Sequence, residues 1–186
     1  MHRLQSPLIL PYSGVYPSLA PNVVVLPGSV IVGDVHIGEE SSVWFNCVIR
    51  GDVHSIHIGK RTNIQDLSML HVTNGKFPLT IGDDITVGHR AIIHGCSVHD
   101  GVLIGMGAVL LDGCTVESGA IVAAGAVVRE GDTVPTGVLV AGVPARVIRN
   151  LDEEEQAAIR RIAGDYVEYA QQYASLLTST EHPLLS

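Results

Sequence analysis

Residues 98–140 read VHDGVLIGMGAVLLDGCTVESGAIVAAGAVVREGDTVPTGVLV, and an aliphatic side chain stands at every sixth position of this stretch. The series comprises Val98, Ile104, Leu110, Val116, Val122, Val128, Val134 and Val140. A period of six matches neither the 3.6-residue turn of an α-helix nor the two-residue alternation of one long strand. Three short strands separated by three bends explain it, because they complete one coil in about 18 residues. The stretch therefore predicts a parallel β-helix with a triangular cross-section.

The same period extends toward the N-terminus with interruptions. Aliphatic residues recur at Val25, Ile31, Ile37, Val43 and Ile49, then at Ile58, Ile64 and Leu70, and again at Ile81, Val87 and Ile93. Each should point into the prism and stack about 4.8 Å from its equivalent in the next coil. Each such burial contributes roughly 1.5 to 3 kcal/mol. An antiparallel barrel or sandwich is the alternative, and the strict six-residue register argues against it.

The period changes after residue 150. Apolar and aromatic residues then recur at helical spacing, after an acidic first turn, at Ile159, Ile162, Tyr166, Tyr169, Tyr173 and Leu177. We therefore expect a mainly β protein with three parts: a β-helix domain with a short N-terminal lead-in over residues 1–150, an amphipathic helix over 151–178, and a loose tail over 179–186.

Composition and charge narrow the possible partners and location. The formal charge of −8 disfavours a nucleic-acid partner, because a phosphate backbone is repelled by an acidic surface. Cys47, Cys96 and Cys114 form an odd set without paired spacing, which favours a reducing compartment and a role in the core or at an interface. The apolar run before Pro11 is too short for a signal or membrane segment. We expect a cytoplasmic protein without a membrane partner.

Polar motifs stand within the repeat in its central part. They are Arg50-Gly51-Asp52, Asn63-Ile64-Gln65-Asp66, His71 and VGHRAIIHG at residues 87–95. With these motifs the sequence resembles the γ-class carbonic anhydrase-like family of hexapeptide-repeat proteins over roughly residues 10 to 178. The resemblance implies left-handed coils, an exception to the usual right-handed crossover, and a homotrimer with a metal at each subunit boundary. It also implies the metal ligands His71, His89 and His94, surrounded by the active-site residues Arg50, Asp52, Asn63 and Gln65.

The register of the repeat supports this ligand set independently. His71 follows the inward Leu70 and His94 follows the inward Ile93, so the two histidines occupy equivalent positions. If five extra residues are looped out between Val72 and Thr80, the two imidazoles stack about 4.8 Å apart and can converge on one ion. His89 should point away from this pair. We therefore expect a neighbouring subunit to supply the third ligand.

The resemblance implies an enzyme that hydrates carbon dioxide reversibly, with a metal-bound hydroxide as nucleophile. Zinc is the expected metal, and Fe²⁺ and Co²⁺ are alternatives. Three neutral imidazoles leave a coordination position for water, whose pKa zinc lowers to about 7. By family analogy, Gln65 orients water or the small-molecule substrate, Arg50 and Asp52 form an ion pair, and Asn63 hydrogen-bonds the product.

One departure from the family pattern weakens the prediction of fast turnover. Family enzymes carry a glutamate after the Arg-x-Asp element, whereas this chain has Val53, and the loop at residues 72–78 lacks acidic residues. A carboxylate that relays protons is therefore missing. Protons would leave through buffer, a nearby histidine, or a C-terminal tyrosine such as Tyr166 or Tyr173.

Three competing functions stay open. The first is a hexapeptide acyltransferase, because the closing sequence VAGVPARVI at residues 140–148 resembles the last coil of many acetyl-CoA-dependent enzymes of that kind. Such a transferase needs one histidine as a base rather than three on a metal. The second is a metal-assisted thioesterase, and the third is a catalytically weak metal-binding scaffold.

Overall fold

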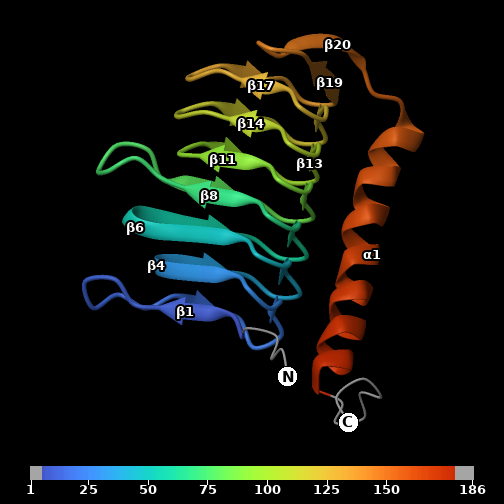
Figure 1. The fold of residues 1–186 in the computed structure, drawn as a ribbon. Helices are drawn as coiled ribbons and strands as arrows, with labels where there is room; N and C mark the ends of the chain where they lie inside the picture. Colours follow the sequence, from blue (N-terminus) through green and yellow to red (C-terminus); the bar gives the residue numbers. More distant parts are fainter. Residues whose placement is uncertain (1–5, 179–186) are drawn as a thin grey trace.

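The computed structural model describes residues 6–178, which form a parallel β-solenoid and one C-terminal helix. The strands stack coil upon coil, and α1 (Glu153–Thr178) runs back along the stack from its C-terminal end (Figure 1). The predicted mainly β fold of hexapeptide coils with a C-terminal helix is confirmed. The tail predicted for residues 179–186 lies outside the described residues.

The strands form the three faces of the prism. Face 1 comprises β1 (Leu8–Leu10), the N-terminal parts of β4 (Val30–Ile37) and β6 (Val48–Ile58), β8 (Met69–His71), β11 (Ile92–His94), β14 (Val109–Leu110) and β17 (Val127–Val128). Face 2 comprises β2 (Ser18–Leu19), the C-terminal parts of β4 and β6, β9 (Leu79–Ile81), β12 (Ser97–Val98), β15 (Thr115–Val116) and β18 (Thr133–Val134). Face 3 comprises β3 (Val24–Val25), β5 (Ser42–Val43), β7 (Asn63–Ile64), β10 (Thr86–Val87), β13 (Leu103–Ile104), β16 (Ile121–Val122) and β19 (Val138–Ala141), closed by the antiparallel β20 (Arg146–Asn150).

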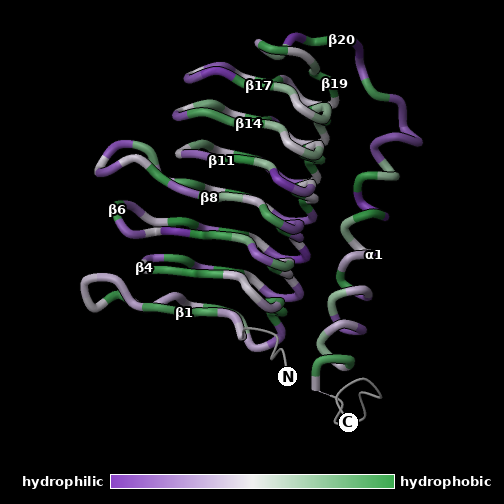
Figure 2. Tube along the Cα trace, in the orientation of Figure 1, coloured by the Kyte–Doolittle hydropathy of each residue, from purple (hydrophilic) through white to green (hydrophobic). Residues whose placement is uncertain are grey.

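The hydrophobic core is the interior of the prism, where the six-residue series stacks in register. On face 3, for example, the inward side chains pair from coil to coil in the order Ile64, Val87, Ile104, Val122 and Val140. The predicted inward residues are buried, apart from the half-buried Val25 in an early coil. Apolar segments recur from coil to coil along the strands, interspersed with hydrophilic ones (Figure 2). The periodicity therefore identified the core residue by residue.

Two irregularities break the repeat in the central coils. In β6, the register with β4 shifts after Gly51, so that Asp52 lies on a bulge. Between β8 and β9 the chain leaves the coil at Val72 and returns at Leu79, with an antiparallel bridge between Thr73 and Phe77. This excursion restores the register and confirms the predicted looped-out segment, because His71 pairs directly with His94.

The helix covers face 3 and begins at a defined cap. The backbone N–H of Glu155 donates to Oδ1 of Asp152, and the backbone N–H of Asp152 donates to a carboxylate oxygen of Glu155. This reciprocal capping explains why α1 begins at Glu153 rather than at residue 151. Ile159, Ala163 and Ala170 are its buried residues, so the helix packs on face 3 through one stripe. None of the described helices has an apolar run long enough to cross a membrane.

The three cysteines are free and buried, as the sequence predicted. Burial raises the pKa of the Cys47 thiol to about 12. A hydrogen bond with Cys114, together with burial, raises the pKa of Cys96. These two thiols are therefore protonated near neutral pH and act as small core residues.

Candidate metal centre

His71 and His94, called here the histidine pair, form the centre of the site. They end β8 and β11, which are neighbouring strands of face 1, and their ring centroids lie 5.1 Å apart. Nδ1 of His71 and Nε2 of His94 are separated by 3.1 Å. Equivalent positions in successive coils thus bring two ring nitrogens together, as the register predicted.

A carboxylate holds each ring from behind. Nε2 of His71 lies 3.0 Å from Oδ1 of Asp52, and Nδ1 of His94 lies 2.6 Å from Oδ1 of Asp112. When each neutral ring donates its outer N–H to its carboxylate, the two inner nitrogens present lone pairs to each other. Two facing lone pairs at this distance favour a cation between them.

The pKa values of the two carboxyl groups agree with this arrangement. Burial raises the pKa of Asp52, but hydrogen bonds from Arg50 and His71 outweigh it and leave the pKa below its ordinary value. Burial likewise raises the pKa of Asp112, and hydrogen bonds from Thr73 and His94 outweigh it in the same direction. Both groups are therefore carboxylates at neutral pH, as hydrogen-bond acceptors for the rings must be.

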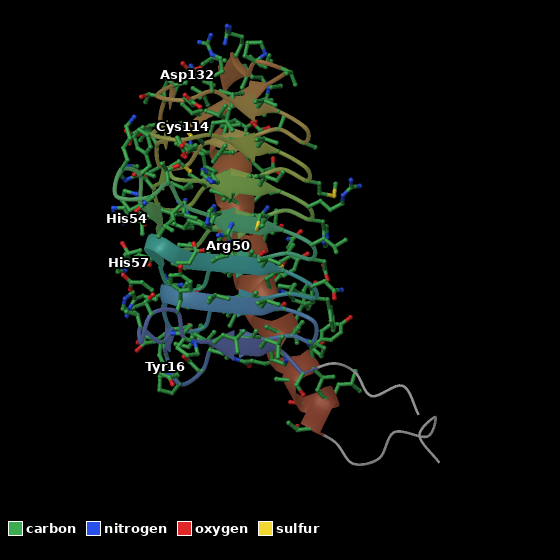
Figure 3. The ribbon with its side chains drawn as sticks, turned by 60° about the vertical axis from the view of Figure 1, so that its left-hand side comes forward. Tyr16, Arg50, His54, His57, Cys114 and Asp132 are labelled. Atoms are coloured by element: carbon green, nitrogen blue, oxygen red, sulfur yellow. The ribbon has the colours of Figure 1, made fainter. Side chains whose placement is uncertain are left out.

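Arg50 completes this side of the site. Its Nη1 donates to Oδ2 of Asp52, so the bulge in β6 carries a hydrogen-bonded pair whose other carboxylate oxygen accepts from His71. Figure 3 shows Arg50 on β6 together with His54 and His57, which lie further along the same strand. The predicted ion pair is present, and it orients His71 by holding Asp52 in place.

The donor set fits a zinc ion but is incomplete on one chain. Two neutral imidazoles backed by carboxylates are typical of zinc sites, and nitrogens 3.1 Å apart are compatible with bonds of roughly 2.0–2.1 Å to one ion. Among residues 6–178, no group of three His, Cys, Asp or Glu side chains is placed to hold a metal. A single chain therefore presents two of the three expected ligands together.

His89 lies apart from the histidine pair, beside the helix. Its Nδ1 is 2.7 Å from Oδ2 of Asp66, and its side chain is 42% exposed. It lines a groove of about 480 Å³ between face 3 and α1, together with Gln65 and Tyr166. Burial raises the pKa of Tyr166, and the charge of Asp66 acts in the same direction. The third predicted ligand thus faces outward with Nε2 directed away from its carboxylate partner.

Asn63 and Gln65 lie on the same side of the molecule as His89, and both are buried. Nδ2 of Asn63 donates to Oγ1 of Thr86 at 2.9 Å, and Nε2 of Gln65 donates to Oδ1 of Asn63 at 3.2 Å. Asn63 is therefore engaged by its neighbours and fixes the amide of Gln65. The predicted active-site residues consequently form two groups: Arg50, Asp52, His71 and His94 on face 1, and Asn63, Gln65 and His89 on face 3.

Two carboxylates of the site are not among the residues that the sequence predicted for it. Asp112 supports His94, and Asp66, which stands within one of the polar motifs, supports His89. A signal for Asp112 existed, because it stands 18 residues after His94 and so one coil above it. Asp66 stands 23 residues before His89, the same offset that separates His71 from His94 once the looped-out segment is counted, so the register offered a signal for Asp66 as well.

The comparisons with known proteins agree with this architecture. A family model described as bacterial transferase hexapeptide (six repeats) matches residues 16–51 and 95–130. The chain is 49% identical to a carbonic anhydrase of Geobacillus kaustophilus over 169 residues, which cover 91% of this chain and 92% of that protein. It is 47% identical to the mitochondrial gamma carbonic anhydrase 1 of Arabidopsis thaliana over 156 residues, 81% of this chain and 57% of that protein.

A solved structure from Bacillus cereus, described as an acetyltransferase, superposes with a TM-score of 0.90 at 44% identity and covers 92% of this chain and 99% of that one. The names of these relatives differ in the reaction. The identities to proteins named as carbonic anhydrases extend over most of the chain. The chain therefore belongs to the γ-class carbonic anhydrase-like family of hexapeptide-repeat proteins.

Proposed function

We propose that this protein is a homotrimeric, metal-dependent γ-type carbonic anhydrase that hydrates carbon dioxide reversibly, with one site at each subunit boundary. The observation that carries the proposal is the histidine pair, whose inner nitrogens face each other 3.1 Å apart while a carboxylate accepts from the far side of each ring. Zinc is the proposed metal, because three neutral imidazoles with an open position form a common zinc site.

His71 and His94 of one subunit and His89 of the next would hold the ion. Zinc held in this way would supply a hydroxide nucleophile near neutral pH. Arg50 and Asp52 keep His71 in the orientation that leaves Nδ1 for the metal. Because Nε2 of Gln65 donates to Asn63, Oε1 is the atom left to accept a hydrogen bond from water or substrate at the site.

The surface of the chain supports assembly with further copies of itself. An outward apolar ladder follows face 1 directly beside the histidine pair, formed by Val48, Met69, Ile92, Val109 and Val127. The groove at His89 is lined mostly by apolar residues of face 3 and α1. These two surfaces differ, so their contact is heterologous and closes a ring when the rotation is threefold. The same contact would bring His89 of one copy to the histidine pair of another.

The first test is metal content per subunit and carbon dioxide hydration on the same purified full-length protein. We expect one zinc per subunit, and we expect His89→Ala to lose zinc and weaken the trimer. His99→Ala is the control, because this exposed histidine lies outside the site, with a side chain that is 52% exposed. Zinc without hydration would contradict the enzymatic proposal, and full zinc occupancy in His89→Ala would contradict the ligand assignment.

Mixed trimers test whether the site is shared between subunits. His89→Ala and His94→Ala chains, unfolded together and refolded as a mixture, form some boundaries at which one chain supplies the pair and the other supplies His89. In an equal random mixture about one boundary in four is intact, and zinc binding should return to that extent. Each variant refolded alone should bind none. Absence of recovery in verified mixed trimers would contradict a shared site.

The competing function is acyl transfer, favoured by the description of the Bacillus cereus structure and by the shared closing coil. The carboxylate behind each ring of the histidine pair argues for metal ligation, since a transferase needs one histidine as a base. A metal-free trimer that transfers an acetyl group from acetyl-CoA would contradict our proposal and favour the acyltransferase.

The three free cysteines fit a reducing compartment, and we propose that the protein is located in the cytoplasm.

A further inference from the structure

The segment between β8 and β9, residues 72–78, lies across the neighbouring coils on the side of Asp112. Oγ1 of Thr73 donates to Oδ2 of Asp112 at 2.6 Å. Phe77 packs against the backbone of Gly95 and Gly113, where a side chain on either glycine would clash with it. The segment is therefore held in place by a hydrogen bond at Thr73 and by the packing of Phe77.

Asp112 uses both carboxylate oxygens within this arrangement. Oδ1 accepts from Nδ1 of His94, and Oδ2 accepts from Thr73, so neither oxygen can rotate away without losing a hydrogen bond. The side chain of Asp112 is 21% exposed, which keeps competing water limited. An imidazole whose Nδ1–H is held by a carboxylate has its lone pair on Nε2, which here is the atom facing His71.

We infer that Asp112 is a positioning residue for the proposed metal ligand His94, and that Thr73 locks Asp112 in place. The inference rests on the proposed function, because it assigns Asp112 to the support of that same site. Asp112 sets which ring nitrogen of His94 carries the proton and where Nε2 points. It mirrors Asp52, which does the same for His71 from the opposite side of the pair.

The test is zinc affinity measured by competition with a chromophoric chelator on the full-length protein. Asp112→Ala should lower the affinity about 10- to 100-fold, as expected for loss of the carboxylate behind a ligating histidine. Thr73→Val keeps the shape of the side chain but removes the donor, and should lower the affinity about two- to tenfold. Asp112→Asn should fall between wild type and Asp112→Ala, because its amide oxygen still accepts from His94.

The matched control is Glu130→Ala. Glu130 is an exposed carboxylate one coil further along the chain and lies away from the histidine pair, so its removal should leave zinc affinity unchanged. Histidine ¹⁵N chemical shifts of the metal-free protein give a second measurement that loss of stability alone would not change. Wild type should show His94 as the Nδ1–H tautomer, and Asp112→Ala should show a mixture of tautomers.

The outcomes separate this inference from the proposed function. Unchanged zinc affinity and tautomer in a folded Asp112→Ala protein would overturn the inference while leaving the metal site intact. A wild-type protein that binds no zinc would overturn the proposed function, and the tautomer measurement would then still report whether Asp112 orients His94. If Asp112→Ala does not fold, zinc affinity and histidine ¹⁵N chemical shifts of Thr73→Val and Asp112→Asn test the inference instead.

Discussion

The coils formed by residues 97–140, called here the regular coils, differ from those formed by residues 40–96, called the site coils. In the regular coils the six-residue period runs without interruption, and glycine occupies each corner with positive φ, from Gly101 to Gly137. In the site coils most of the corresponding corners carry other residues in the same left-handed conformation, while the corner after His94 keeps a glycine, Gly95. The non-glycine corners are Glu40, Asn46, Arg61, Leu67, Asp84 and Arg90. The site coils also contain both irregularities and the buried amides Asn63 and Gln65.

The comparison shows that the same coil geometry can serve as a regular hydrophobic framework or carry the polar residues of a site. A left-handed conformation costs a non-glycine residue roughly 1–2 kcal/mol, and a buried amide is tolerated only when it is hydrogen-bonded. The regular coils avoid both costs. In the site coils, residues in left-handed corners and buried amides can be stabilised by their side-chain partners. Arg61, for example, donates two hydrogen bonds to Asp84. Most polar groups of the site therefore lie in the site coils, and Asp112 is contributed by the first of the regular coils.

The largest expected effect on stability comes from the core of the regular coils. Ile104→Ala should lower the free energy of unfolding by about 2–5 kcal/mol, because a fully buried side chain leaves a cavity. Ile104 also borders the groove at His89, so zinc affinity of the folded trimer should fall slightly. Ile64→Ala, flanked by Asn63 and Gln65, should lower both quantities. Denaturant unfolding and chelator competition measure them, and equal loss of zinc affinity in the two variants would break the comparison.

The buried amide pair should have the next largest effect. Asn63→Ala leaves Nε2 of Gln65 without its partner and should cost about 1–3 kcal/mol of unfolding free energy. Hydration should slow as well, since Gln65 is no longer fixed. Thr115→Ala is the control, because this half-buried side chain of the regular coils should change stability by less than about 0.5 kcal/mol. An Asn63→Ala variant with unchanged unfolding free energy would show that the hydrogen bond between Gln65 and Asn63 does not stabilise the fold.

The corners can be compared by exchanging their residue types. Gly107 has φ +67 and no atom within 4 Å of an added Cβ, so Gly107→Ala measures the conformational cost alone and should destabilise by about 1–2 kcal/mol. Leu67→Gly should have an effect near zero, because relief of the left-handed conformation is offset by greater freedom of the unfolded chain. Thermal unfolding distinguishes the two variants. Equal destabilisation would contradict the interpretation of the corners.

Val53 gives a smaller, kinetic test within the site coils. It packs against the core at the position where the family pattern has a glutamate, so this position offers no carboxylate to carry protons away from the site. Hydration should therefore rise several-fold with imidazole concentration, since general acid–base groups in solution replace a missing one. A rate independent of imidazole concentration would show that another group of the chain already transfers the proton.

The smallest expected effect concerns the cap of α1, outside both sets of coils. Hydrogen bonds from Arg149 and from the backbone of Asp152 lower the pKa of Glu155 to about 2 from its ordinary 4.5. A lowered folded-state pKa contributes stability that is complete above the unfolded value and is lost as pH falls toward the folded value. The melting temperature of Glu155→Gln should therefore lie below that of wild type above pH 4.5 and approach it between pH 4.5 and 2. A pH-independent difference would contradict the assignment.

The sequence by itself determined the coil architecture, the inward residues and the pairing of His71 with His94. The physical reason is that a hexapeptide repeat is local: each aliphatic side chain sets the position of its equivalent one coil later. The same local logic predicted the looped-out segment, because without it the two histidines would fall out of register.

Only the tertiary structure decided how the polar groups are joined. The contacts of Asp112 with His94 and Thr73, the burial of Asn63, and the separation of His89 from the histidine pair depend on side-chain rotamers, on the path of the segment at residues 72–78, and on the position of α1. A repeat fixes which face a side chain leaves from, but it does not fix which neighbour the polar end reaches. The periodicity therefore determined which strands and faces carry the site residues, and the packing around the two irregularities determined which polar groups contact each other.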